Sequence, residues 1–273
     1  MKPAIIRIIS EDSYFQYLET IRHNRTKRHR AGEFFVEGVR AITQAVEKGW
    51  EMRALAYSRE KRLSDWARGI IANAGARRHY ELSLTLMEKL SQKEESSELI
   101  ALVAMPQDEL SRIPLHERLL VVILDRPASP GNLGAILRSC DALGVDGVIV
   151  SGHAADLYDP ETIRATVGSF FSVPVVRLPS HTELLPWLDD LKQRVHGLQM
   201  VGTSARAKIP IGKWNFTLPT ILSVGNETNG LSDAYQALAD GMVTIPMQGY
   251  ASSLNLACAT SILLYEVSRQ RVG

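Results

Sequence analysis

LLVVILDRPASPGNLGAILRSCDALG, residues 119–144, is the stretch of sequence that decides the fold. Residues 119–124 form an uninterrupted apolar run, which is typical of a strand covered on both faces of a parallel sheet. Ser129 and Pro130 then suit the N-cap and the first position of a helix. Apolar residues recur at helical spacing as far as Gly144, which ends the helix. The stretch therefore predicts a buried strand followed directly by a helix, as in α/β proteins.

The same alternation continues toward the end of the sequence. Short apolar runs predict five further strands, at residues 148–150, 173–176, 199–202, 220–224 and 242–245. A last helix is expected over residues 253–270, with Ser253 as its possible N-cap. Short apolar strands that alternate with helices predict a parallel, doubly wound sheet.

The first hundred residues have shorter apolar runs between amphipathic stretches. Strands are expected at residues 34–36, 52–57 and 99–105, and helices at residues 39–48, 64–74 and 83–90. A charged segment with two prolines, residues 105–118, separates the two patterns. We therefore divide the chain into an N-terminal α/β domain (residues 1–110), a linker (111–118) and a C-terminal domain (119–273).

Composition places the chain among folded proteins. Of its 273 residues, 45% are apolar and 22% are charged, which excludes a largely disordered chain. No apolar run reaches the roughly 20 residues that cross a bilayer. The amino-terminal sequence has no secretory pattern, so we expect a cytoplasmic protein without a membrane partner. Cys140 and Cys258 fall on apolar helical positions and are expected to be buried. A single disulfide between them is the alternative that the sequence leaves.

The net charge of +1 conceals a basic run, IRHNRTKRHR at residues 21–30. Such a run is either a solvated surface or a phosphate-binding surface, and the sequence alone leaves both open. The run contains no acid, and its lysine and arginines are Arg22, Arg25, Lys27, Arg28 and Arg30.

Polar residues and glycine follow three of the predicted strands in the C-terminal domain. They are Asn132 and Arg138 after the first strand, Gly225 and Glu227 after residues 220–224, and Ser253 and Asn255 after residues 242–245. Each alone has a structural explanation as a turn residue, a surface charge or a helix cap. The carboxyl ends of parallel strands meet at one edge, where ligands bind in open α/β sheets. We therefore expect a ligand site there.

Several common sites are missing from the sequence. No strand is followed by the glycine fingerprint of dinucleotide-binding proteins, and there is no P-loop. No nucleophile elbow of an α/β-hydrolase occurs. No cysteine and histidine spacing matches a zinc site.

Three segments at these loops are similar to one family. They are PGNLGAILR (residues 130–138), GNETNGL (225–231) and IPMQG with SSLNL (245–249 and 252–256). The sequence resembles the SpoU (TrmH-type) branch of the SPOUT superfamily of RNA 2′-O-ribose methyltransferases. KRHRAGEFFVEG (27–38) is similar to the family's RNA-binding domain, which is like a small ribosomal protein. RATVGS (164–169) follows the family pattern only in part.

The resemblance implies a parallel-sheet methyltransferase domain with a C-terminal trefoil knot, which the sequence pattern alone does not predict. It also implies S-adenosylmethionine as methyl donor, no metal, a homodimer and an RNA substrate. Ribosomal RNA is favoured over tRNA because a separate N-terminal domain suits the recognition of RNA loops or hairpins. The catalytic residues carried over are Arg138, Asn132, Glu227, Ser253 and Asn255. The donor pocket carried over consists of Gly225, Ile245, Leu254 and Thr203, and the basic run would bind RNA phosphates.

Arg138 is the residue to which the family assigns activation of the hydroxyl. Because arginine stays protonated, we expect it to bind phosphate and stabilise negative charge on O2′ rather than act as a base. Glu227 and Asn132 are expected to hold its guanidinium in place. Two alternatives remain: a knotted RNA-binding protein without catalysis, and a Rossmann-type enzyme that uses a nucleotide cofactor.

Overall fold

The computed structural model of the chain describes residues 3–91 and 96–272. The chain forms two compact units, each made of two segments. Unit 1 comprises Met1–Pro106 and Asp156–Ser172, and unit 2 comprises Gln107–Ala155 and Val173–Gly273. This division differs from the predicted domains in two respects. Residues 107–118, predicted as the end of the N-terminal domain and a linker, belong to unit 2, and Asp156–Ser172, inside the predicted C-terminal domain, packs with the first unit.

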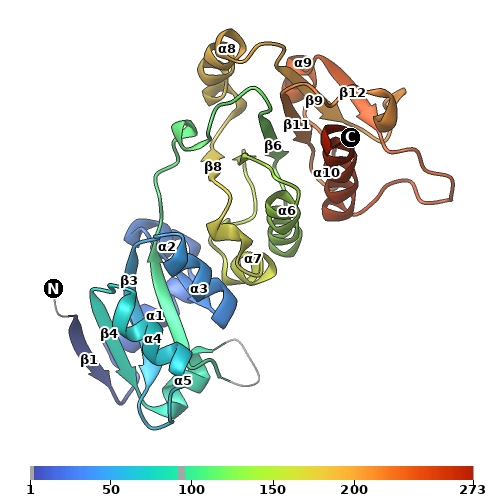
Figure 1. The fold of residues 1–273 in the computed structure, drawn as a ribbon. Coiled ribbons are helices and arrows are strands. Elements are labelled where there is room, and N and C mark those ends of the chain that lie inside the picture. The colour runs from blue at the N-terminus through green and yellow to red at the C-terminus, as the bar shows by residue number, and fades with distance from the viewer. Residues whose placement is uncertain (1–2, 92–95, 273) are drawn as a thin grey trace. The chain divides into compact units, whose positions relative to one another are not determined.

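Unit 1 is built on a five-stranded mixed sheet in the order β1-β4-β3-β5-β2 (Figure 1). Its strands are β1 (Ala4–Ile8), β2 (Glu33–Glu37), β3 (Met52–Ser58), β4 (Arg78–Leu82) and β5 (Leu99–Ala104). Strand β5 is antiparallel to both of its neighbours, and the other pairs are parallel. The helices are α1 (Ser13–His23), α2 (Arg25–Ala31), α3 (Val39–Glu47), α4 (Asp65–Asn73), α5 (Leu84–Leu90) and α7 (Pro160–Ala165).

An aromatic cluster attaches the second segment of unit 1 to the first. Phe34 of β2 contacts Tyr158, Phe170 and Phe171, with ring centroids 4.9–6.3 Å apart. The indole N–H of Trp50 donates a hydrogen bond of 3.1 Å to the carbonyl of Phe171. Buried aromatic pairs add stability beyond the area that they bury. The cluster is therefore the core through which Asp156–Ser172 belongs to unit 1.

Unit 2 confirms the predicted parallel sheet, whose order is β10-β12-β9-β11-β6-β7-β8. Its strands are β6 (Leu120–Asp125), β7 (Gly147–Ser151), β8 (Val175–Leu178), β9 (Gln199–Thr203), β10 (Ile209–Pro210), β11 (Thr220–Val224) and β12 (Gly241–Thr244). The helices are α6 (Pro130–Ala142), α8 (Leu185–Arg194), α9 (Asp233–Leu238) and α10 (Leu256–Val272). Every strand pair in this sheet is parallel, and β6, β7 and β11 are buried along their whole length.

The ends of the two helices nearest the predicted site are set by side chains. Ser129 caps α6, because its Oγ accepts from the backbone N–H of Asn132 at 3.3 Å. Helix α10 begins at Leu256 and not at Ser253, since Asn255 Oδ1 accepts from the N–H groups of Ala257 and Cys258. The N-cap of the last helix is therefore Asn255.

The cysteine prediction is half wrong. Cys140 is buried, but Cys258 is exposed in the first turn of α10, and both are free thiols. Within the described ranges, no helix is long and apolar enough to span a membrane.

Candidate functional site

Three loops of unit 2 leave the sheet at one edge, because β6, β11 and β12 all run in the same direction. Asn132 lies in the first turn of α6, Glu227 follows β11, and Asn255 precedes α10. Asn255 Nδ2 donates to Asn132 Oδ1 at 3.0 Å, and Asn132 Nδ2 donates to Glu227 Oε1 at 3.1 Å. These three residues, the amide–carboxylate cluster, form one hydrogen-bonded chain across the three loops.

Glu227 is the only charged member of this cluster. Its other carboxylate oxygen accepts from the backbone N–H of Ala128 at 3.1 Å. Burial alone would raise the pKa of Glu227, but the hydrogen bonds from Asn132 and from backbone N–H groups outweigh it and lower the pKa. Glu227 is therefore an ionised acceptor that fixes which way the Asn132 amide points.

Arg138 lies further along α6 with its side chain exposed. Within residues 3–91 and 96–272 its guanidinium forms no hydrogen bond or ion pair, so the expected contacts from Glu227 and Asn132 are absent. All five N–H donors of the guanidinium are consequently available to a ligand. Such an exposed cation is suited to binding a phosphate.

Gly225 is required by the loop that carries Glu227. A Cβ atom at Gly225 would lie 2.0 Å from the backbone nitrogen of Leu231 and 2.1 Å from the carbonyl carbon of Gly230. The loop closes on itself, since Asn226 and Gly230 exchange two backbone hydrogen bonds of 3.0 and 2.9 Å. Only glycine permits this return of the chain.

The remaining residues predicted for the donor pocket lie at the same edge of the sheet. Thr203 ends β9 and donates to the carbonyl of Ser223 at 3.1 Å, and the half-buried Ile245 follows β12. Leu254 and Ser253 are exposed in the loop before α10. In the described chain, neither side chain has a hydrogen bond or ion pair. The structure therefore brings Asn132, Glu227 and Asn255 into contact, but not Ser253 or Arg138.

The loop between β12 and α10 has free backbone donors. In the part of the chain that the structure describes, no backbone N–H of residues 247–254 donates to a protein acceptor. Free backbone N–H groups beside a glycine-lined turn suit the adenine and carboxylate of a nucleoside-type ligand. The residues present therefore fit S-adenosylmethionine. The described residues include no group of three or more metal-ligating side chains.

Two residues beside the cluster were missed by sequence reasoning. Asn226 Nδ2 donates to the carbonyl of Arg126 at 2.7 Å, and the backbone of Arg126 has a φ of 56°. Arg126 also forms a bidentate ion pair with the buried Asp125, at 2.9 and 3.0 Å. Asn226 could have been found from the sequence, because it is a polar residue next to Glu227. A positive φ at an arginine cannot be predicted from the sequence.

The basic run of unit 1 contains both buried and exposed residues. Arg28, which the sequence analysis assigned to RNA binding, is buried. Its side chain is 1% exposed, and its guanidinium donates to Asp156 Oδ2 at 2.9 and 3.2 Å. It also donates to the carbonyls of Ile21 and Arg22 at the end of α1. A buried arginine with its donors satisfied is unavailable to RNA, so Arg28 is removed from the predicted RNA-binding set.

His29 also contacts Asp156, at 3.0 Å, and Arg28, His29 and Asp156 are called here the ion-pair cluster. Burial raises the pKa of the Asp156 carboxyl, but the contact with His29, the charge of Arg28 and the backbone N–H of Tyr158 outweigh it. Together they hold the pKa of Asp156 at about 2. The cluster fastens the start of Asp156–Ser172 to α2.

The other residues of the run differ in exposure. Arg22 is half-buried and donates to the carbonyls of Lys89 and Leu90 at the end of α5, which ties it to the fold. Arg25, Lys27 and Arg30 are exposed. These three cations on α2 remain the candidates for RNA phosphates.

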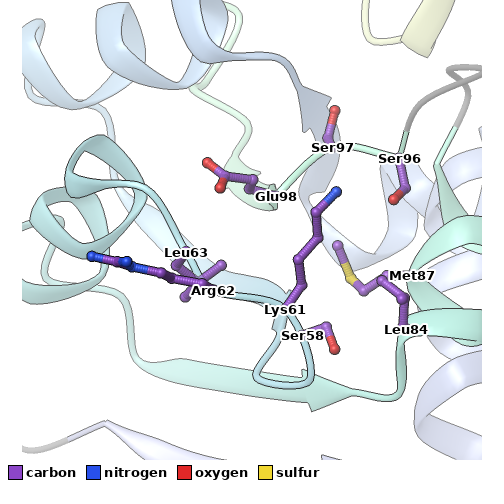
Figure 2. A pocket seen from close by; sticks show the side chains of 9 residues that line it. All are labelled: Ser58, Lys61, Arg62, Leu63, Leu84, Met87, Ser96, Ser97 and Glu98. Atoms are coloured by element: carbon purple, nitrogen blue, oxygen red, sulfur yellow. The ribbon is translucent and has the colours of Figure 1, made fainter.

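A separate small hollow lies in unit 1 (Figure 2). Its lining comprises Ser58, Lys61, Arg62, Leu63, Leu84, Met87, Ser96, Ser97 and Glu98. Figure 2 shows the Lys61 side chain extending across the hollow, while Arg62 points away. The carboxylate of Glu98 already binds the backbone and hydroxyl of Ser64. None of the predicted site residues lines it, so the candidate site is at the sheet edge of unit 2.

Comparison with known proteins agrees with the residues gathered at this edge. Residues 119–265 match the SpoU rRNA Methylase family, and residues 12–101 match the SpoU L30e-like domain. The 23S rRNA (uridine(2479)-2′-O)-methyltransferase of Streptomyces viridochromogenes is 46% identical over 271 residues, covering 99% of this chain and 94% of the relative. The 23S rRNA (guanosine(2553)-2′-O)-methyltransferase RlmP of Bacillus subtilis is 29% identical, covering 90% and 92%.

Solved structures give the same result. The crystal structure of the SpoU methyltransferase AviRb from S. viridochromogenes in complex with the cofactor AdoMet superposes with a TM-score of 0.91 at 46% identity. The superposition covers 96% of this chain and 99% of AviRb. The family model spans more than half of the chain, and it includes all three loops of the candidate site. The protein belongs to the SpoU rRNA methylase family.

Proposed function

We propose that the protein transfers a methyl group from S-adenosylmethionine to a ribose 2′-hydroxyl in 23S-type ribosomal RNA. The observation that carries this proposal is the 46% identity, over 99% of the chain, to a 23S rRNA 2′-O-methyltransferase. A second relative, RlmP, also methylates 23S rRNA by its name, which favours ribosomal RNA over tRNA. The hydrogen-bonded amide–carboxylate cluster at the sheet edge supports a catalytic protein rather than an RNA-binding protein without catalysis.

S-adenosylmethionine would lie against the backbone of Gly225, Ile245 and Leu254, with Thr203 beside it. Its bound form supplies an electrophilic methyl group. The free backbone N–H groups of residues 247–254 and the closed turn at Gly225 support this placement. The proposed reaction uses no metal ion.

Arg138 would bind the phosphate next to the target ribose and stabilise the negative charge that develops on O2′. The O2′–methyl bond forms as the bond between sulfur and methyl breaks, and the hydroxyl proton passes to solvent. The exposed, unpaired guanidinium in the described chain supports this role. A nearby cation also lowers the pKa of the hydroxyl that it contacts.

The amide–carboxylate cluster would orient the ribose and the donor. Glu227 fixes the orientation of the Asn132 amide, and Asn132 in turn fixes the orientation of the Asn255 amide. Ser253, exposed two residues before Asn255, would complete the contacts to ribose or donor. Preorganised polar groups of this kind cost little reorganisation during reaction.

Membership of the family is the basis for several further proposals. We infer that unit 1 binds RNA through Arg25, Lys27 and Arg30, that the protein is a cytoplasmic homodimer, and that its C-terminal part forms a trefoil knot. The position of β12 between β9 and β10 supports the knot. The packing of α10 against α6, including the 2.8 Å contact between Ser139 and Ser261 hydroxyls, supports it further.

The test is transfer of tritium from labelled S-adenosylmethionine to unmodified 23S rRNA and tRNA transcripts. We expect label in 23S rRNA, at a linkage that resists alkaline cleavage. Arg138→Ala should lower kcat by about 10²–10³-fold, as loss of one charge-stabilising donor does. The dissociation constant of S-adenosylmethionine should stay unchanged.

Other outcomes would overturn parts of the proposal. Label in tRNA alone would show that the substrate is tRNA and not 23S rRNA. RNA binding without methyl transfer to either RNA would favour the alternative of an RNA-binding protein without catalysis. Weaker donor binding by Arg138→Ala would contradict the role assigned to Arg138.

A further inference from the structure

The loop that carries Glu227 is attached at both ends to the segment that follows β6. Asn226 Nδ2 donates to the carbonyl of Arg126 at 2.7 Å. At the other end of the loop, the backbone N–H of Ser232 donates to Asp125 Oδ2 at 2.8 Å. Glu227 lies between these two attachments, so its position depends on residues 125 and 126.

Asn226 is held in one orientation. Its Oδ1 accepts from the backbone N–H groups of Thr228 and Asn229, at 2.9 and 3.3 Å. Its backbone N–H and carbonyl both bond Gly230. The one remaining contact, from Nδ2 to Arg126, joins this closed turn to the β6–α6 segment. Because Glu227 is the next residue, the contacts that hold Asn226 also fix the position of the Glu227 backbone.

Arg126 occupies an unusual backbone conformation. Only Arg126 and Val167 have a positive φ among the non-glycine residues that the structure describes. Two contacts hold Arg126 there: the bidentate pair with Asp125, and a bond of 2.9 Å from its N–H to the carbonyl of Ser151. A Cβ at Gly152 would lie 2.8 Å from Cγ of Arg126. Strain that neighbouring residues maintain in this way is concentrated at functional sites.

We propose that Arg126 and Asn226 are positioning residues for the methyl transfer. The left-handed backbone of Arg126 presents its carbonyl to Asn226, and that hydrogen bond sets Glu227 against Asn132. The role of Arg126 is carried by its main chain, with the side chain serving to hold the conformation. This inference rests on the proposed function for its effect on rate, but the positioning of the loop can be measured without activity.

Matched variants at Arg126 distinguish the effect of its backbone conformation from the effect of its guanidinium. Arg126→Gly and Arg126→Val both remove the guanidinium, but glycine adopts a positive φ without cost and a β-branched residue resists it. We expect kcat of Arg126→Val to be at least about tenfold below that of Arg126→Gly, with KM for RNA nearly equal in the two. Arg126→Asn should resemble Arg126→Gly, because asparagine tolerates this region.

Hydrogen exchange of the peptide that covers residues 225–232 provides a readout that needs no catalysis. The amides of Thr228, Asn229 and Gly230 should exchange faster in Arg126→Val than in Arg126→Gly. If wild-type protein transfers no methyl group but this difference is present, the proposed function fails while the positioning of the loop stands. Val167→Gly is the control, since it relieves the other positive φ, in unit 1, and should leave kcat unchanged.

Asn226→Asp keeps the inference testable if Arg126→Val does not fold. An aspartate still accepts from Thr228 and Asn229, but it cannot donate to the carbonyl of Arg126. We expect kcat to fall at least about tenfold with a melting temperature close to that of wild type. Equal kcat and equal exchange in the glycine and valine variants would overturn the inference. So would equal losses in all three Arg126 variants, which would assign the role to the guanidinium instead.

Discussion

The ion-pair cluster of unit 1 and the amide–carboxylate cluster of unit 2 use polar side chains in opposite ways. Arg28 and Asp156 are almost fully buried, and each charge has an opposite charge and hydrogen bonds around it. Glu227 is exposed and ionised, and its partners are the Asn132 amide and backbone N–H groups rather than a cation. The first arrangement is complete without a ligand and holds the fold together. The second leaves charge and donors at the surface, as a binding site requires.

Breaking the ion-pair cluster should produce the largest effect. Arg28→Ala leaves Asp156 buried without its cation, and we expect the free energy of unfolding to fall by about 3–5 kcal/mol. Urea unfolding measures this change. Arg30→Ala, at an exposed position on the same helix, is the matched control and should change stability by less than about 0.5 kcal/mol. Equal effects of the two variants would refute the structural role of Arg28.

Breaking the amide–carboxylate cluster should affect rate instead of stability. Glu227→Ala removes the acceptor that orients Asn132, and hydrogen bonds to charged groups contribute about 1.5–3 kcal/mol. We therefore expect a fall in kcat of roughly 10–10²-fold in the methyl-transfer assay, with a small change in melting temperature.

Glu227→Gln is the matched variant, because it keeps one carbonyl oxygen for Asn132 but loses the charge. It should be less impaired than Glu227→Ala. A loss of stability in Glu227→Ala as large as that in Arg28→Ala would erase the contrast between the two clusters.

Acid should weaken the ion-pair cluster. The pKa of Asp156 is about 2 in the folded chain, below the ordinary value of 3.8. A lowered folded-state pKa contributes stability that is present above pH 3.8 and is lost as the pH falls through about 2. The difference of nearly two pKa units corresponds to about 2 kcal/mol.

Unfolding of wild type and Asp156→Asn between pH 6 and pH 2 tests this expectation. The stability difference between the two proteins should be constant above pH 5 and shrink below pH 4. A difference that does not change down to pH 2 would mean that Asp156 is not held ionised by its neighbours.

The smallest expected effect concerns the exposed part of the basic run. Neutralising Arg25, Lys27 and Arg30 to glutamine should reduce the slope of log affinity for single-stranded rRNA against log salt by about 2, since each phosphate contact contributes roughly 0.7. Filter binding of an rRNA fragment at several salt concentrations measures the slope.

The matched control neutralises three exposed cations of unit 2, namely Arg206, Lys208 and Lys213. It changes the net charge by the same amount. If both triple variants flatten the slope equally, general charge rather than the surface of α2 accounts for the binding.

The sequence predicted the sheet of unit 2 well, because a strand buried on both faces leaves a continuous apolar run such as residues 119–124. It missed β4 and α2, whose sequences RHYEL and RTKRHRA are dominated by polar and charged residues. The five-residue strand β4 is largely buried even so. In α2, Arg28 faces the interior, which no charge pattern distinguishes from an exposed position.

The candidate site was predictable to the extent that it depends on topology. Asn132, Glu227 and Asn255 were chosen because parallel strands end at one edge, and they do form a hydrogen-bonded chain. The link between Arg126 and Asn226 depends on a backbone angle and on a bond from a side chain to a carbonyl. Neither the backbone angle nor this hydrogen bond can be predicted from the residue types.

The chain passes between the two units three times, after Pro106, after Ala155 and after Ser172. Neither unit is therefore a module that a single gene fusion could move. An exchange of the first 106 residues with those of a relative would separate Arg28 from Asp156 and Phe34 from Phe170. A functional chimera would therefore need both residues of each pair from the same protein. A single proteolytic cut at one of the three passages would leave the two units covalently joined.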